Sequence, residues 1–378
     1  MAREPLNVQL LFDVLTCERS ADWWGGSEPY LWTVFFKIDG ATVKVLNTTQ
    51  LSGKGTIASN IGSHGNLEVA EMNTGDVAFV PPAVGLFENT LIPIPVDPPL
   101  SSVVPDASGV VGAAVTLWEE DDFPAEAANI GYDQFAIQVE WAMQEIIKKR
   151  NLASMEPTPK ELEEVQNAVN AGVAASIRRY LISRSWLGNQ DDVLGFELFR
   201  FSHDSFGTAA FQPFSKRWSG EDGDWVLSGQ AVGVPPCPVS AVLEGLGPRA
   251  GELRGADEIQ AAMRLFRDQI FPNNPRLGFW WSILEKRSAS LAVAVRKSQE
   301  LQNAMLDLFA DVHSLLLDPG KSIDAAMARR ADMALQKIGE TADKQFSREL
   351  AKIRPLLSQV EGKTLVDLAL KVSQTDPN

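Results

Sequence analysis

The stretch Asp22-Trp23-Trp24-Gly25-Gly26-Ser27-Glu28-Pro29-Tyr30 stands directly before an apolar run that covers residues 30–36. Two other acidic clusters also border strand-like runs: Glu119-Glu120-Asp121-Asp122 follows one, and Asp191-Asp192 precedes another. Carboxylates from separate loops at one end of a sheet suit a hard cation such as calcium, which takes about six to eight oxygen ligands. The sequence therefore predicts that the three clusters meet at one end of a sheet and bind a cation.

The composition limits the classes of partner. The chain has 378 residues, of which 45% are hydrophobic and 22% are charged, as is typical of a globular protein with two or three domains. Its formal net charge of -15 argues against nucleic acid, whose binding requires Lys and Arg to neutralise phosphates. The same charge disfavours anionic lipid, unless bound cations invert the local sign. Two cysteines are too few for a disulfide framework.

No targeting segment is evident in the sequence. The N-terminal residues lack the apolar core of a signal peptide. No run of roughly 18 apolar residues is present, so we expect no conventional membrane span. We therefore expect a cytoplasmic protein, and we leave open both peripheral association with a membrane and export that needs no N-terminal signal.

The pattern of apolar residues predicts the fold class α+β. Short apolar runs separated by turn residues predict β-strands on both sides of a segment that has helical periodicity. Within that segment, Thr158-Pro159-Lys160-Glu161 predicts the start of a helix through a capping box. We expect an antiparallel β-sandwich over 1–123 and 188–236, an inserted helical hairpin at 124–187, a linker at 237–256, and an all-α helical hairpin or bundle at 257–378.

The three acidic clusters resemble the calcium loops of a known domain family, the calcium-dependent lipid-binding domain of protein kinase C and the synaptotagmins, here called the C-two domain. Its first loop has the pattern Asp-x-x-Gly-x-Ser-Asp-Pro-Tyr, and the residues at those positions here are Asp22, Gly25, Ser27, Glu28, Pro29 and Tyr30. Leu117-Trp118-Glu119-Glu120-Asp121 and Asp192-Val193-Leu194-Gly195 are similar to two later motifs. The resemblance implies that calcium is bound by Asp22, Glu28, Glu119, Asp121 and Asp192, and that the bound ion bridges to lipid phosphates.

The chain also departs from that family. Glutamates stand in place of two aspartates, the segment between residues 36 and 110 is longer than in the family, and a long segment, 123–190, separates Asp122 from Asp191. A second alignment uses Asn129-Ile130-Gly131 as the last motif; we prefer Asp192, because a carboxylate precedes its Val-Leu-Gly. The alternative to a metal site is an ordinary turn followed by a solvated acidic loop.

Aromatic and helical segments suggest the contacting surfaces. Trp23 and Trp24 are candidates for membrane contact, since tryptophan favours the membrane–water interface; alternatively they cover the end of the sandwich. The helical insert either contacts a membrane or partner as an arm, or packs on the sandwich or on the C-terminal helices through its own apolar stripe. We expect one long helix from about Leu277 to Leu317 and another from about Ser322 to Val360. An apolar side of these helices suggests a homo-oligomer formed through residues 277–360, or packing on the insert.

Catalytic motifs are weak in this sequence. His64, His203 and His313 are scattered, and no Gly-x-Ser-x-Gly elbow occurs. We therefore expect a calcium-responsive protein that binds a membrane surface or a protein partner and has no enzymatic activity. Two alternatives remain: a structural or assembly protein that oligomerises through its helices, and an effector that permeabilises membranes.

Overall fold

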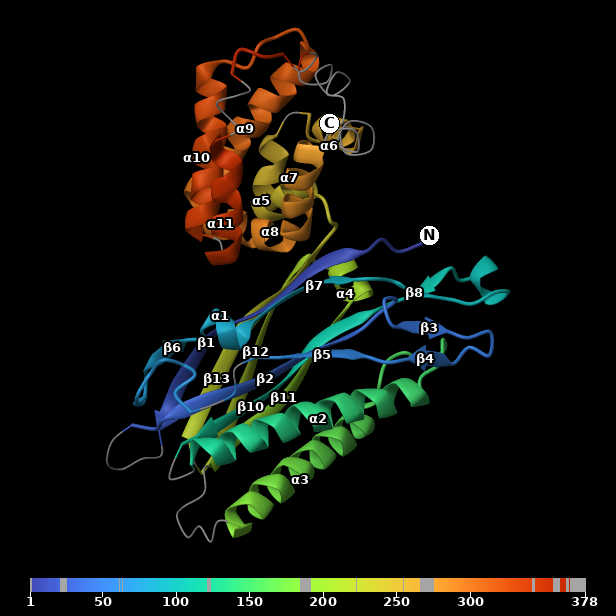
Figure 1. Ribbon diagram of the computed structural model, residues 1–378, viewed down its shortest axis with the longest axis vertical. Helices are drawn as coiled ribbons and strands as arrows, with labels where there is room; N and C mark the ends of the chain where they lie inside the picture. Colours follow the sequence, from blue (N-terminus) through green and yellow to red (C-terminus); the bar gives the residue numbers. More distant parts are fainter. Residues whose placement is uncertain are drawn as a thin grey trace. The chain divides into compact units, whose positions relative to one another are not determined.

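The chain folds into two units, Met1–Gly233 and Val234–Asn378. The computed structural model describes residues 2–20, 26–60, 62, 64–120, 124–183, 192–221, 223–253, 255–265, 275–341, 344–355, 361–364 and 367. The first unit holds two large sheets and several helices, and the second is built from helices (Figure 1). The predicted α+β class with antiparallel sheets is confirmed.

One sheet joins the beginning of the chain to the end of the first unit. Its strand order is β12-β13-β1-β6, and β7 also pairs with β1. The strands are β1 (Leu6–Ser20), β6 (Val77–Phe79), β7 (Leu86–Leu91), β12 (Phe211–Gly220) and β13 (Gly223–Val234). The length of β1 allows it to pair with β7 over residues 6–11 and with β6 over residues 14–16. The short helix α1 (Pro82–Gly85) separates β6 from β7.

The second sheet has the strand order β11-β10-β2-β5. Its strands are β2 (Pro29–Ile38), β5 (Thr56–Ser59), β10 (Val110–Glu119) and β11 (Asp192–Ser202). Successive side chains of a strand point to opposite faces. On β2, Leu31 and Phe35 belong to a core shared with the first sheet, whereas Trp32 and Val34 belong to a core shared with helices. Burial on both faces explains why the sequence of this strand is almost continuously apolar.

Short elements complete one end of the first unit. They are β3 (Val43–Val45) paired with β4 (Leu51–Gly53), β8 (Ile94–Pro95) paired with β9 (Asp106–Ala107), the 3-10 helix η1 (Leu100–Ser102) and helix α4 (His203–Thr208). A third apolar cluster contains Val45, Ile94 and Ile147, and so connects these strands to the end of a long helix.

Two 25-residue helices, α2 (Ala125–Lys149) and α3 (Pro159–Ser183), cover the outer face of the second sheet (Figure 1). The expected capping box is present: the Glu161 amide donates to Thr158 Oγ1 (3.3 Å), and the Thr158 amide donates to Glu161 Oε2 (2.8 Å). A Cβ atom on Gly131 would lie 2.6 Å from Trp32, so the glycine permits close packing of α2 on the sheet. Of the two alternatives for the insert, its apolar stripe therefore packs on the sheet.

The second unit contains more helices than the sequence suggested. They are α5 (Pro238–Leu246), η2 (Gly247–Glu252), α6 (Ala256–Leu265), α7 (Pro275–Lys286), α8 (Ser288–Lys297), α9 (Gln299–Leu317), α10 (Ala325–Thr341) and α11 (Lys344–Ile353). The segment 237–256, which we expected to be a linker, instead holds α5 and η2, and α5 is largely buried. The single helix expected over 277–317 is divided into α7, α8 and α9, with breaks at Arg287 and at Ser298. At the second break, Ser298 caps α9 by accepting from the Leu301 amide (3.1 Å).

The centre of the second unit is helix α8, in which Ser288 to Val295 are all buried. A Cβ atom on Gly245 of α5 would lie 2.6 Å from the Ala292 carbonyl oxygen, so the small residue allows the two helices to approach closely. The apolar residues of α9 that suggested an oligomer surface, among them Leu301, Met305 and Leu315, are buried within this unit. They thus contribute to the core of their own chain.

Candidate functional site

Predicted metal ligands stand at one end of three neighbouring strands. Glu119 ends β10, and the antiparallel register pairs it with Pro29 of β2 and with Asp192 of β11. Glu28 precedes Pro29, and its carbonyl oxygen accepts a hydrogen bond from the Glu120 amide (2.9 Å). The fold therefore brings together backbone positions that are far apart in sequence. We call this end of the second sheet, with Glu28, Glu119, Glu120 and Asp192, the acidic end.

The loop that carries Asp22 begins and ends at the acidic end. The hydroxyls of Ser20 and Ser27 are hydrogen-bonded at 3.1 Å, on either side of residues 21–25. Ser27 and Met72 exchange two backbone hydrogen bonds (3.1 and 2.8 Å), and Glu71 accepts from the Gly26 amide (3.4 Å). Any side chain at Gly26 would meet the Met72 carbonyl oxygen, so the glycine permits this contact. The two ends of the predicted calcium loop are thereby held together.

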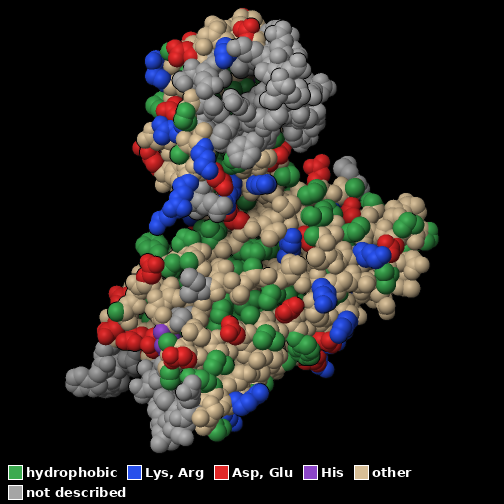
Figure 2. Space-filling view, viewed as in Figure 1, with side chains coloured by type: hydrophobic (Ala, Val, Ile, Leu, Met, Phe, Trp, Pro, Cys, Tyr) green, Lys and Arg blue, Asp and Glu red, His purple; other side chains and the backbone are tan. Residues whose placement is uncertain are grey.

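The carboxylates of the acidic end differ in environment. Glu28 is exposed, whereas Glu119 is 9% exposed. Glu120 Oε1 lies 3.0 Å from His64 Nδ1, and the His64 ring lies 4.9 Å from that of Tyr30. Glu28 and Glu120 border an open hollow of about 180 Å³ that also contacts Gly65 and Val69. Figure 2 shows acidic side chains gathered at the lower left of this view, where β1 ends and β2 begins in Figure 1.

The described carboxylates do not complete a calcium site by themselves. Within the described ranges, no three His, Cys, Asp or Glu side chains lie close enough together to bind a metal ion. A complete site would need the carboxylates of Asp22, Asp121 and Asp192. Asp22 and Asp121, together with Trp23 and Trp24, lie outside the described residues, and for Asp192 the backbone alone is described.

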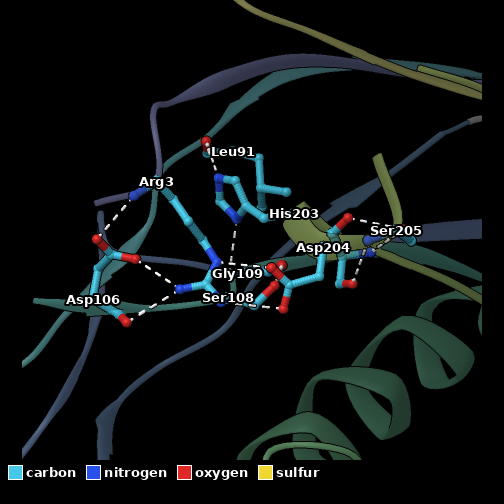
Figure 3. Close-up of polar contacts among 9 residues, drawn as sticks. Arg3, Leu91, Asp106, Ser108, Gly109, His203, Asp204 and Ser205 are labelled. Carbon is cyan, nitrogen blue, oxygen red and sulfur yellow. Dashed lines mark hydrogen bonds and ion pairs between the residues drawn. The ribbon is translucent and has the colours of Figure 1, made fainter. Parts of the chain in front are cut away.

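A second polar cluster, which sequence reasoning missed, surrounds Arg3 (Figure 3). Its guanidinium pairs with Asp106 (2.8 Å) and Asp204 (2.9 Å), and the Arg3 amide donates to Asp106 (3.0 Å). The hydrogen bond from Arg3 lowers the pKa of Asp204 below its usual value. The cluster fastens the start of the chain to β9 and α4. No sequence pattern indicated these pairs, because the three residues are remote from one another in sequence.

His203 lies beside this cluster and is buried. Its Nδ1 accepts from the Gly109 amide (3.0 Å), so Nε2 carries the proton and donates to the Leu91 carbonyl oxygen (3.1 Å). Burial lowers the pKa of the imidazole. Both ring nitrogens are used by the backbone, so the role of this histidine is to hold α4 against β7 and the start of β10.

His203 should make the stability of the protein depend on pH. Because its pKa is lower in the folded state than in the unfolded chain, stability is complete above the ordinary histidine pKa of about 6.5 and falls as pH decreases through the folded value. We expect the thermal midpoint of the wild-type protein to fall between about pH 7.5 and about pH 5, and His203→Gln to flatten this part of the profile. His313→Gln, which removes a partly exposed ring in the second unit, is the control. An unchanged slope in His203→Gln would contradict the assignment.

The comparisons with known proteins give no family. Neither the protein-family models nor the curated proteins searched include a match to this chain. Among the helices in the part of the chain that the structure describes, none combines the length and the apolar character needed to cross a membrane. The candidate site therefore rests on the residues and geometry given above.

Proposed function

We propose that this protein binds calcium at its acidic end and uses the bound ion to attach to an anionic membrane surface, without catalysing a reaction. The observation that carries the proposal is the strand register that places residues 28, 119 and 192 at one end of the second sheet. The proposed fold of the first unit is a C-two-like β-sandwich of the two large sheets, with α2 and α3 as the insert.

Electrostatics explain why a cation would be required. The chain carries a net charge of -15, and the acidic end adds a local excess of carboxylates, so an anionic membrane would repel it. A bound divalent cation becomes the largest local charge and reverses that repulsion. Calcium with open coordination positions would then bind lipid phosphates, and Trp23 and Trp24 from the same loop would enter the interfacial layer.

A protein partner and assembly through residues 277–360 receive less support. A protein partner would have to bind at the same acidic end. The vesicle experiment below distinguishes a protein target from a lipid target. The apolar residues of α9 are already buried in their own unit, which leaves little of the predicted oligomer surface for a second chain. We therefore favour the calcium-dependent membrane function over oligomerisation.

The test uses calcium and anionic vesicles. We expect calcium to give measurable heat on titration, and the protein to sediment with phosphatidylserine vesicles in calcium but not in chelator. Glu28→Gln should weaken calcium binding by roughly tenfold, since the charge of the ligand set tunes affinity. Glu163→Gln, which removes an equally exposed carboxylate from α3, should bind as the wild type does.

Two results would remove the proposal. One is the absence of calcium heat together with equal sedimentation in calcium and chelator. The other is a Glu28→Gln variant that binds calcium as well as Glu163→Gln. If calcium binds but the protein does not sediment with the vesicles, the target of the calcium-bound protein is a protein partner and not a membrane.

A further inference from the structure

A narrow apolar crevice lies between the helices α2 and α3 and the outer face of the second sheet. Its walls include Phe36, Val139, Met143, Val165, Phe196 and Leu198. The crevice has a volume of about 60 Å³ and is partly open to solvent. A space of this shape admits an alkyl chain more readily than a bulky ring system.

The charged residues of the crevice gather where α2 ends. Arg150, which is 4% exposed, donates from Nη1 to the Glu156 carbonyl oxygen (2.8 Å) and pairs through Nη2 with Glu161. Its Nε–H is buried and has no hydrogen-bond partner among the residues that the structure describes. Buried donors are nearly always paired in folded proteins, so this one marks a place where a ligand oxygen would be favoured.

A second guanidinium borders the same space. Arg200 of β11 pairs with Glu156 (3.0 Å), a residue whose side chain is 69% exposed. An ion pair with so exposed a carboxylate contributes little, and water readily replaces it. Arg200 can therefore exchange Glu156 for the carboxylate of a ligand, which guanidinium binds through two parallel hydrogen bonds.

We propose that this crevice binds one fatty acid, with its alkyl chain between the helices and the sheet and its carboxylate at Arg150 and Arg200. The charges agree with a single carboxylate. Glu161 balances Arg150, so one positive charge remains on Arg200 when Glu156 turns to solvent. The apolar walls favour the alkyl chain by removing it from water. This site lies apart from the acidic end, so it does not depend on the calcium function.

The test is a titration of the whole protein with cis-parinaric acid, which fluoresces in apolar surroundings, followed by displacement with dodecanoate or dodecanol. We expect saturable binding of one probe per chain. Val165→Phe, which fills the crevice, should weaken probe binding roughly tenfold or more, an effect on the scale of a lost buried apolar contact. Ala171→Phe adds the same ring at an exposed position on α3 and should bind as the wild type does.

A second variant tests the head group. Arg200→Gln should weaken dodecanoate binding roughly tenfold, the effect of one charged hydrogen bond, and leave dodecanol binding unchanged. Arg200 is chosen because Arg150 also holds the loop between α2 and α3. The proposal is overturned if the wild type shows no saturable binding, if a folded Val165→Phe variant binds like Ala171→Phe, or if Arg200→Gln affects both ligands equally. Binding should be the same in calcium and in chelator, so failure of the calcium proposal leaves this result intact.

Discussion

Replacing Asp39 with alanine should lower the free energy of unfolding by about 3–5 kcal/mol, the usual cost of breaking a buried ion pair. Asp39 is 0% exposed and pairs with Lys37 at 3.0 Å. It also accepts hydrogen bonds from the amides of Ala41 (3.1 Å) and Ile92 (2.8 Å). The substitution would leave a buried ammonium without its counter-charge and two amides without an acceptor, and urea denaturation measures the loss.

The chain offers a matched control for this experiment. Asp97 pairs with Lys44 at 2.9 Å, but both side chains are substantially exposed. Asp97→Ala should therefore cost only about 0–1 kcal/mol. The double variant Lys37→Met/Asp39→Ala should recover part of the loss, because no uncompensated charge stays buried. If Asp39→Ala and Asp97→Ala lower stability equally, the buried pair does not have the role assigned to it.

The second large effect is expected at Phe12, where the two main sheets meet. Its ring lies 6.0 Å from Phe35 and 5.5 Å from Phe199 of the second sheet, and 5.3 Å from Phe214 of its own sheet. Phe12 is 0% exposed. Phe12→Ala should lower the free energy of unfolding by about 3–5 kcal/mol, because it removes buried apolar surface and leaves a cavity.

Phe79→Ala is the control for Phe12→Ala, because it makes the same substitution in the same sheet on β6, where the ring is 78% exposed. Its effect should stay within about 0.5 kcal/mol, as is usual for surface positions. Phe12→Leu, which keeps most of the volume, should cost less than about 1.5 kcal/mol. A Phe12→Ala variant as stable as Phe79→Ala would show that the sheets do not depend on this aromatic cluster.

Several elements could be predicted because their signals are local. Thr158 and Glu161 are three residues apart, and they form the capping box that the sequence indicated. The apolar stripe of α2 has helical spacing, and it is buried as one face. The boundaries were harder: the helix expected over 277–317 is three helices, because the cap at Ser298 and the packing of α8 outweigh a continuous helical pattern.

The candidate site also combines features that the sequence predicts with features that depend on the tertiary structure. The sequence indicated which carboxylates stand next to strands, but pairing of Glu119 with both Pro29 and Asp192 depends on the order and register of three strands. As a local pattern, Asp39-Gly40 indicates only a turn. In the fold, Asp39 is a buried ion-pair residue whose hydrogen-bond donors include the distant Ile92 amide. Arg150 gave no signal in the sequence, although it lines the crevice.

The sequence by itself determined the α+β class, the positions of the helices α2 and α3, and the acidic clusters beside strands, because periodicity, capping and turn chemistry act over a few residues. The tertiary structure alone decided which strands are neighbours, that α2 and α3 cover the second sheet, and which charges are buried together. These features depend on contacts between residues distant in sequence, and the free energy of such contacts arises only when the whole unit has folded.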